Sequence, residues 1–203
     1  MEISSVTGVV PTRDQAFAIL SEYTKSESLI KHGLAVESAM KWYAGFYQQD
    51  VNLWCVTGLL HDFDYERFPT YSLEPTPTGH PFSGCEILKD LNFSPEIIEA
   101  ILGHAKYSGV ERKTLMAKAL FACDELSGLI TAAVLVRPDK SIHNLEVNSV
   151  KKKMKDKTFA RGVDREDIRV GCEELGIELD QHIQNVISGM KESAKVLGLE
   201  GVA

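Results

Sequence analysis

Hydrophobic residues recur at three- and four-residue intervals along nearly the whole chain, which is the spacing of one face of an α-helix. No segment shows the strict apolar–polar alternation of a half-buried strand, and the chain has no internal repeat. The pattern predicts a first helix that begins at the capping box Thr12–Gln15, followed by helices at about Ser26–Tyr47, Asp50–Leu60, Pro81–Leu91, from Ser94 onward, and at about Lys113–Leu135, Asp164–Leu175 and Ile177–Leu197. We therefore expect an all-α fold, a compact helical bundle.

One long stretch, Asp64–Gly79, interrupts the helical pattern and contains three prolines among turn-forming serines and threonines. It contrasts with the sharp helix start at Ser94, where an N-cap residue is followed by a proline in the first turn. Long irregular loops in compact domains are often lids or binding loops. We expect the stretch Asp64–Gly79 to wall one side of a ligand pocket.

Composition and charge narrow the class of protein. The chain has 203 residues, of which 44% are hydrophobic and 25% are charged, as in a soluble globular protein of one domain covering residues 1–203. Its net charge of −7 argues against a partner made of nucleic acid, because DNA and RNA are held through many Lys and Arg contacts. A small anionic substrate, such as a nucleotide, remains compatible with this charge because a metal ion can supply positive charge locally.

The cysteines and the N-terminal segment favour a cytoplasmic protein. Four widely spaced cysteines form no pair of zinc-finger spacing, and Cys55 and Cys123 have the apolar neighbours of buried thiols. The first ten residues lack the basic flank and apolar core of a signal peptide. The longest nearly apolar run, Leu129–Val136, is far shorter than the roughly 20 residues that span a bilayer. We expect no membrane association.

Six histidines and aspartates stand out because most of them lie in or beside apolar helical stretches: His32, His61, Asp62, His80, His104 and Asp124. Imidazole and carboxylate groups bind Fe, Mn, Zn and Co, and a buried charge is costly unless it is paired or bound to metal. Asp124 lies inside the most apolar helix of the chain. Together with His32 and the adjacent pair His61–Asp62, Asp124 would make one complete site. His80 and His104, sharing Asp62, would make a second.

The order of these residues resembles the HD-domain superfamily of metal-dependent phosphohydrolases. A histidine is followed after about thirty residues by an adjacent His-Asp pair and then by a distant aspartate, and the segment Gly58–Asp62 carries the resemblance most strongly. The additional residues His80 and His104 are similar to those of the two-metal subgroup. The resemblance implies an all-α HD-domain bundle, with a metal-site core at about residues 26–136 and a C-terminal helical extension at about residues 146–203.

The resemblance also implies roles for the residues. The family usually hydrolyses phosphate esters, on nucleotides or similar anions, with divalent ions, here expected to number two and drawn from Fe, Mn, Co, Zn and Mg. His61 and Asp62 would be the catalytic pair, with Asp62 bridging both ions and a metal-activated water as the nucleophile. Lys106 and Arg112, just after His104, are the candidate substrate-binding residues because Lys and Arg are natural partners of phosphate.

The sequence departs from the best-known subgroup directly after the motif. Members of that subgroup read His-Asp-Ile-Gly, whereas Phe63 and Asp64 follow the pair here. Some nucleotidases of the superfamily carry a glutamate where this chain has Tyr65. The resemblance therefore does not imply a substrate by analogy with either subgroup.

Other charged and histidine residues receive structural interpretations. His143 lies in a polar turn and His182 flanks an apolar stripe, so we interpret both as structural or exposed rather than as ligands. The basic run Lys151–Arg161 is typical of a solvated helix face.

Two alternatives to a hydrolase remain open at this point. A few two-metal HD proteins are similar to di-iron oxygenases with the same six ligands, and a non-catalytic module would hold metal or a nucleotide without turnover. Metal identity and oxygen consumption separate the oxygenase from the hydrolase. The sequence gives no indication of the oligomeric state.

Overall fold

The structure is a computed structural model that describes residues 8–202, so most of the N-terminal segment examined for a signal peptide lies outside the described residues. The described chain contains ten α-helices, two short 3-10 helices (Lys106–Ser108 and Ile142–Asn144), and isolated β-bridges but no strand. The helices are α1 (Arg13–Tyr23), α2 (Glu27–Phe46), α3 (Val51–Leu60), α4 (Phe82–Asp90), α5 (Pro95–His104), α6 (Leu115–Leu135), α7 (Val147–Lys155), α8 (Arg165–Leu175), α9 (Leu179–Glu192) and α10 (Ala194–Leu197). The all-α prediction is confirmed.

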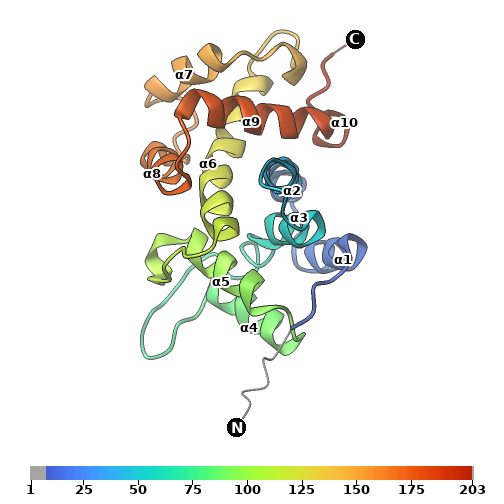
Figure 1. The fold of residues 1–203 in the computed structure, drawn as a ribbon, viewed down its shortest axis with the longest axis vertical. Coiled ribbons are helices and arrows are strands. Elements are labelled where there is room, and N and C mark those ends of the chain that lie inside the picture. The colour runs from blue at the N-terminus through green and yellow to red at the C-terminus, as the bar shows by residue number, and fades with distance from the viewer. Residues whose placement is uncertain (1–7, 203) are drawn as a thin grey trace.

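Helix α6 runs through the middle of the molecule and joins its two ends (Figure 1). It packs against α2 on one side, against α5 near its start, and against α7, α8 and α9 along the rest of its length. Helix α2 in turn packs on α3, α6 and α9. Two long helices are thus covered by the others, and the proposed ligands on α2 and α6 lie where these helices meet.

Local sequence signals explain where most helices begin. Thr12 and Gln15 form the expected capping box, and the side chains of Asp50, Thr114 and Asp164 each accept a hydrogen bond from a backbone N–H in the first turn of their helix. The expected single helix over residues 177–197 is wrong. It is divided into α9 and α10 at Ser193, whose backbone leaves helical geometry.

The centre of α2 is buried on every side rather than along one stripe. All residues from Gly33 to Met40 are buried, including the carboxylate-bearing Glu37, which pairs with the guanidinium of Arg13 at 2.6 Å. The cause is tertiary, because three other helices surround this segment. A one-sided amphipathic pattern underestimates how much of such a central helix is enclosed.

Close helix crossings depend on glycine. A Cβ atom at Gly171 on α8 would lie 2.6 Å from the Cα atom of Ala122 on α6, so the two helices approach closely only because position 171 has no side chain. A Cβ atom at Gly45, near the end of α2, would meet no atom within 4 Å.

We expect Gly171→Ala to lower the free energy of unfolding by about 1–3 kcal/mol, since the added methyl group forces α6 and α8 apart. Gly45→Ala is the matched control and should raise the free energy of unfolding by up to about 1 kcal/mol, because alanine is the better helix former. Urea unfolding of both variants measures the difference. Equal effects of the two substitutions would show that the α6–α8 crossing does not need a glycine.

His182 forms a buried polar cluster that fixes α9 against α2 and α6. The His182 side chain is fully buried; its Nε2–H donates to the carbonyl of Ala122 at 2.8 Å, and its Nδ1 accepts from the hydroxyl of Tyr43. Burial lowers the pKa of His182 to about 4. His143, by contrast, is exposed. Neither histidine lies in the candidate metal groups described below.

The low pKa of His182 predicts a loss of stability in mild acid. The unfolded chain binds a proton near the ordinary pKa of 6.5, whereas the folded chain binds it only near 4, so stability falls as the pH drops through this interval. We expect a loss of roughly 2 kcal/mol between pH 8 and pH 5 from this residue. In urea unfolding, the stability advantage of the native protein over His182→Gln should shrink by that amount. An advantage that stays constant with pH would refute the assignment.

The remaining surface and thiol features are ordinary. All four cysteines are free and buried. In the part of the chain that the structure describes, no helix has the length and apolar character needed to cross a membrane.

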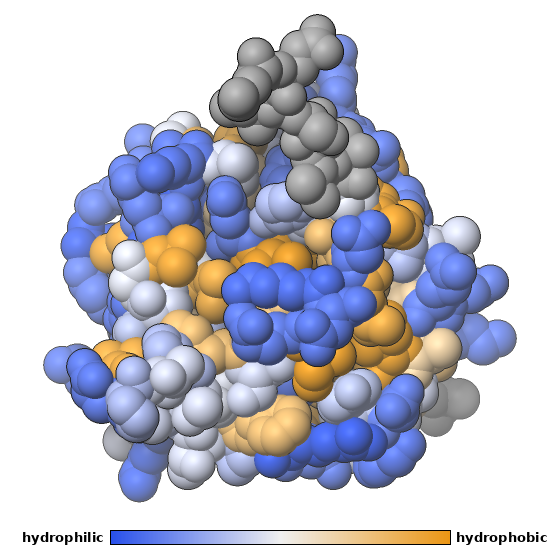
Figure 2. Space-filling view, turned by 90° about the horizontal axis from the view of Figure 1, so that it is seen from below, coloured by the Kyte–Doolittle hydropathy of each residue, from blue (hydrophilic) through white to orange (hydrophobic). Residues whose placement is uncertain are grey.

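Figure 2 shows one face from below, where apolar side chains gather near the middle and a polar side chain lies across them.

Candidate metal centre

The six predicted ligands converge although they come from five separate parts of the chain. His32 lies on α2, the pair His61–Asp62 follows the end of α3, and Asp124 lies on α6. His80 lies just before α4, and His104 is the last residue of α5. Their ligand atoms form two groups, each compact enough for one metal ion: His32, His61 and Asp62, and Asp62, His80 and His104.

The first group is centred on two imidazole nitrogens and two carboxylates. The Nε2 atoms of His32 and His61 lie 3.2 Å apart, and Oδ1 of Asp124 lies 2.9 Å from the first and 3.4 Å from the second. Oδ2 of Asp62 lies 3.4 Å from Nε2 of His61. Four nitrogen and oxygen atoms thus surround one point, which fits a single transition-metal ion.

The second group uses the other oxygen of Asp62. Its Oδ1 atom lies 3.2 Å from Nε2 of His80 and 3.3 Å from Nε2 of His104, and these two nitrogens lie 3.2 Å apart. The two oxygens of one carboxylate therefore face different histidine pairs. This is the arrangement that the sequence analysis expected of a bridging ligand, and the assignment of the ions themselves stays a prediction.

Hydrogen bonds on the far side of the rings fix the tautomer of three histidines. Nδ1–H of His61 donates to the carbonyl of Gly58 at 2.8 Å, and Nδ1–H of His104 donates to the carbonyl of Ile101. Nδ1–H of His80 donates to Oδ1 of Asp64 at 2.7 Å. Each Nε2 atom is thereby left with a free lone pair directed at the cluster, as metal-binding histidines require.

Asp64 holds the ring of His80 in place from the side away from the cluster. It is almost fully buried, and its second oxygen accepts the backbone N–H of Gly84 at 2.8 Å. A Cβ atom at Gly84 would lie 2.6 Å from the Asp64 carboxyl carbon, so only glycine leaves room for this contact. The departure from the His-Asp-Ile-Gly pattern at this position therefore places a carboxylate behind His80.

We expect Asp64→Asn to lower the affinity for the second metal ion by about 10–100-fold. If the amide oxygen of the asparagine accepts the hydrogen bond from His80, its NH₂ group faces the N–H of Gly84, and two donors then oppose each other. The first ion should bind as before. Metal titration followed by calorimetry separates the two affinities, and Asp90→Asn, an exposed change at the end of α4, is the control. Unchanged affinity of both ions would show that Asp64 does not orient His80.

The charges of the cluster also call for a cation. Burial by itself raises the pKa of a carboxyl group, but His61 and His104 hold the pKa of Asp62 well below its usual range. Burial likewise lowers the pKa of a histidine, yet the carboxylates of Asp62 and Asp124 raise that of His61 well above its ordinary value. The carboxylates therefore need positive charge beside them, and a divalent ion supplies it directly. The donor set fits one or two such ions.

One face of the cluster is open to solvent. The side chains of His32, Asp62 and Asp124 are about one-fifth exposed, whereas those of His61, His80 and His104 are 6% exposed or less. A cavity of about 230 Å³ lies over this region, and its walls include Tyr65, Lys106, Tyr107, Phe121, Glu125 and Asp167. A small molecule can therefore reach the cluster only from the side of these partly exposed residues.

The long irregular loop reaches this cavity through Tyr65. Further along the loop, the ring of Tyr71 stacks on that of Tyr107 with centroids 3.8 Å apart and planes 8° from parallel. The hydroxyl of Tyr107 donates to the carbonyl of His80 at 2.9 Å. The loop thus contributes to the rim of the cavity, as expected of the stretch Asp64–Gly79.

The two predicted substrate-binding residues have different positions. Lys106 lines the cavity, but its ammonium group already pairs with Asp164 and Asp167. Arg112 does not line it. Its guanidinium pairs with both oxygens of Glu174 and donates to the carbonyl of Gly103, so these contacts give no support to its expected role in substrate binding, which stays a prediction. Glu174 lies 62 residues further along the chain, so no local sequence pattern indicates this pairing.

Sequence reasoning missed the other residues of the cavity. Tyr107 and Asp167 belong to no sequence motif, and only the folded structure shows that they lie beside the candidate ligands. Glu125 directly follows a ligand, and this adjacency was an available signal. Burial, helped by the charge of Asp124, raises the pKa of Glu125 to about 7.

Comparison with known proteins agrees with the geometry. The family model of the HD domain matches residues 29–129, about half of the chain, and this range includes all six candidate ligands. No curated protein and no solved structure gives a significant match. The chain belongs to the HD-domain superfamily, whose members are mostly metal-dependent phosphohydrolases.

Proposed function

We propose that the protein is a metal-dependent hydrolase of small phosphate esters, nucleotides among them. The observation that carries the proposal is Asp62, whose two oxygens face two separate histidine pairs at 3.2–3.7 Å on the open side of the cluster. Two divalent ions held there would supply Lewis acidity to the phosphoryl oxygens and lower the pKa of a water molecule toward about 7. A phosphate ester is the substrate class that uses both effects.

The residues of the chain have separable tasks in this reaction. His32, His61 and Asp124 would hold one ion, and His80 and His104 the other, and Asp62 would offer one carboxylate oxygen to each. The water oxygen adds to phosphorus, the bond from phosphorus to the ester oxygen breaks, and the departing alcohol takes up a proton. Phe121 and Tyr107 line the cavity beside the cluster and limit the access of bulk water.

Cavity size and charge favour a small substrate. A volume of about 230 Å³ lies below the roughly 300–1,000 Å³ of typical ligand sites, so it accommodates a phosphoryl group and little more. The chain carries a net charge of −7, and Lys106 is neutralised by two carboxylates, so attraction of an anion has to come from the bound ions. A polymer such as RNA would gain no extended basic surface here.

The test is phosphate release from mononucleotides, dinucleotides and small phosphate esters, assayed with Mn²⁺, Co²⁺, Fe²⁺ or Mg²⁺ beside long RNA and DNA. We expect turnover of the small esters and none of the polymers. A preference for the polymers would indicate a nuclease. Oxygen uptake without phosphate release would indicate the di-iron oxygenase, which uses the same ligand types, and full metal loading without turnover of any substrate would indicate a binding module.

A further inference from the structure

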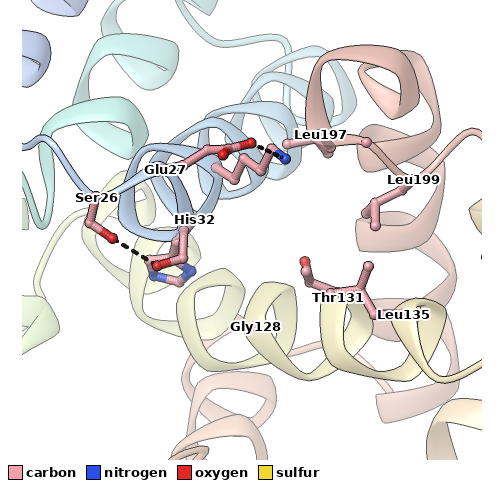
Figure 3. Close-up of a pocket in the computed structure, with 11 residues that line it drawn as sticks. Ser26, Glu27, His32, Gly128, Thr131, Leu135, Leu197 and Leu199 are labelled. Carbon is pink, nitrogen blue, oxygen red and sulfur yellow. Dashed lines mark hydrogen bonds and ion pairs between the residues drawn. The ribbon is translucent and has the colours of Figure 1, made fainter.

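A second, larger cavity adjoins the candidate metal centre at His32. Its volume is about 680 Å³, and it lies between the start of α2, the second half of α6 and the segment around α10. Figure 3 shows Ser26 and His32 at one end and Leu135 and Leu199 at the other. Of the six candidate ligands, only His32 lines it. The volume falls within the range of small-molecule sites, about 300–1,000 Å³, whereas the cavity over Asp62 does not.

The chemistry of the lining changes from one end to the other. Near His32 the walls carry the hydroxyls of Ser26 and Ser28, which bond each other at 2.8 Å. The ammonium group of Lys31 pairs with Glu27 at 2.6 Å, so it offers no free charge for a second phosphate. The far end is formed by aliphatic side chains: Leu135, Leu197 and Leu199, with Thr131 between them and the histidine.

Among the residues that the structure describes, no Phe, Tyr, Trp, Asn or Gln side chain lines this cavity, and its one imidazole, that of His32, belongs to the candidate metal centre. Nucleobases are usually held by stacking on aromatic rings and by paired hydrogen bonds to their edges. The wall fits instead a flexible aliphatic group, whose burial against leucines is favourable by itself. The aromatic side chains near the cluster, Tyr65, Tyr107 and Phe121, line the other cavity.

We propose that the cavity at His32 binds the aliphatic alcohol portion of the phosphate ester while the phosphoryl group lies over the open face of Asp62 and Asp124. The inference rests on the proposed hydrolysis and narrows its substrate class to alkyl phosphates or amphiphilic phosphate esters. The ester oxygen then lies between Asp124, which lines the cavity over Asp62, and His32, which lines this one; Nε2 of His32 and Oδ1 of Asp124 are 2.9 Å apart. Leu135 is a specificity residue of this site.

Two neighbouring residues supply a matched pair of variants. Leu135 lines the cavity and is half exposed, and Val136 is equally accessible but does not line it. Leu135→Trp fills the apolar end, whereas Val136→Trp adds the same ring outside the cavity. Thr131→Phe blocks the middle and serves as a second test if the first variant folds poorly. Circular dichroism and thermal melting check the fold of all three.

The experiment measures the binding of methyl-, butyl- and hexylphosphonate, which are not hydrolysed, to Mn²⁺-loaded protein by calorimetry. Each fully buried methylene should tighten Kd about three- to fourfold, so we expect hexylphosphonate to bind the native protein and Val136→Trp at least about tenfold more tightly than methylphosphonate. Leu135→Trp should remove this dependence on chain length. Equal binding of the methyl and hexyl compounds to the native protein would overturn the proposal.

Two further measurements separate this inference from the proposed function. Binding of 1-hexanol to metal-free protein, followed by ligand-observed NMR, should be lost in Leu135→Trp and kept in Val136→Trp, whether or not any ester is hydrolysed. Hydrolysis of methyl and hexyl phosphate with equal kcat/KM would leave the hydrolase standing and refute the aliphatic site. Tight binding of adenosine monophosphate to the native protein that is lost in Leu135→Trp would also refute the aliphatic site, and it would indicate that the cavity binds a nucleoside.

Discussion

Asp62→Ala is expected to remove both metal ions and to abolish phosphate-ester hydrolysis. Within residues 8–202, Asp62 alone belongs to both candidate groups, and its oxygens lie 3.2–3.4 Å from the Nε2 atoms of His61, His80 and His104. Removing it takes a ligand from each ion and leaves buried histidines crowded around the gap. Elemental analysis after dialysis should find less than one-tenth of the native metal content, and the rate of phosphate release should fall by at least about 10³-fold.

His143→Ala is the control for this variant. His143 is exposed and lies outside both groups, so its replacement should leave metal content and activity at native levels. Asp62→Ala protein that retains two ions per chain would mean that the bridging role is wrong. A loss of metal in His143→Ala would place the ligands elsewhere.

His104→Ala should remove one ion and leave the other. The Nε2 atom of His104 approaches Asp62 and His80 but takes no part in the group formed by His32, His61 and Asp62. The metal content should therefore fall from two ions to one per chain, while activity drops by two orders of magnitude or more because the phosphoryl charge is no longer shared. Elemental analysis and the initial rate of phosphate release test both statements.

The reciprocal variant is His32→Ala, which should also leave one ion, in the second group. The double variant His32→Ala/His104→Ala should then retain none. Loss of both ions in either single variant would show that the two groups do not bind independently. Two ions in His104→Ala would show that this histidine is a core residue without a metal.

Local sequence information was sufficient for the features that depend on neighbours in the chain. The caps at Thr12 and Asp50 are fixed by hydrogen bonds within three residues, and the helical period of α6 follows from its apolar spacing. The candidate ligands were chosen the same way, because a carboxylate such as Asp124 inside an apolar helix needs a partner. His61 and His32 were grouped with it by residue type and apolar surroundings, and the resemblance to a family then supported the same set.

The remaining features depend on contacts between distant segments. Asp64 supports His80 because the loop returns to α4 after sixteen residues, and Arg112 is turned away from the cavity by Glu174 on α8. Ser193, where α9 and α10 divide, accepts a hydrogen bond from the hydroxyl of Ser38 on α2 at 2.7 Å, a partner that is likewise distant in the chain. The cavity at His32 has no sequence signature at all, since its walls come from α2, α6 and the C-terminal segment.

The most direct test of the two-metal hydrolase is the initial rate of phosphate release from a small phosphate ester, measured as metal-free protein is titrated with Mn²⁺. Two ions that share Asp62 predict a rate that rises to a plateau at two equivalents per chain, with little activity up to one equivalent if the sites fill in order. A plateau at one equivalent would contradict the second site. No phosphate release at any loading, accompanied by uptake of oxygen, would contradict the hydrolase itself.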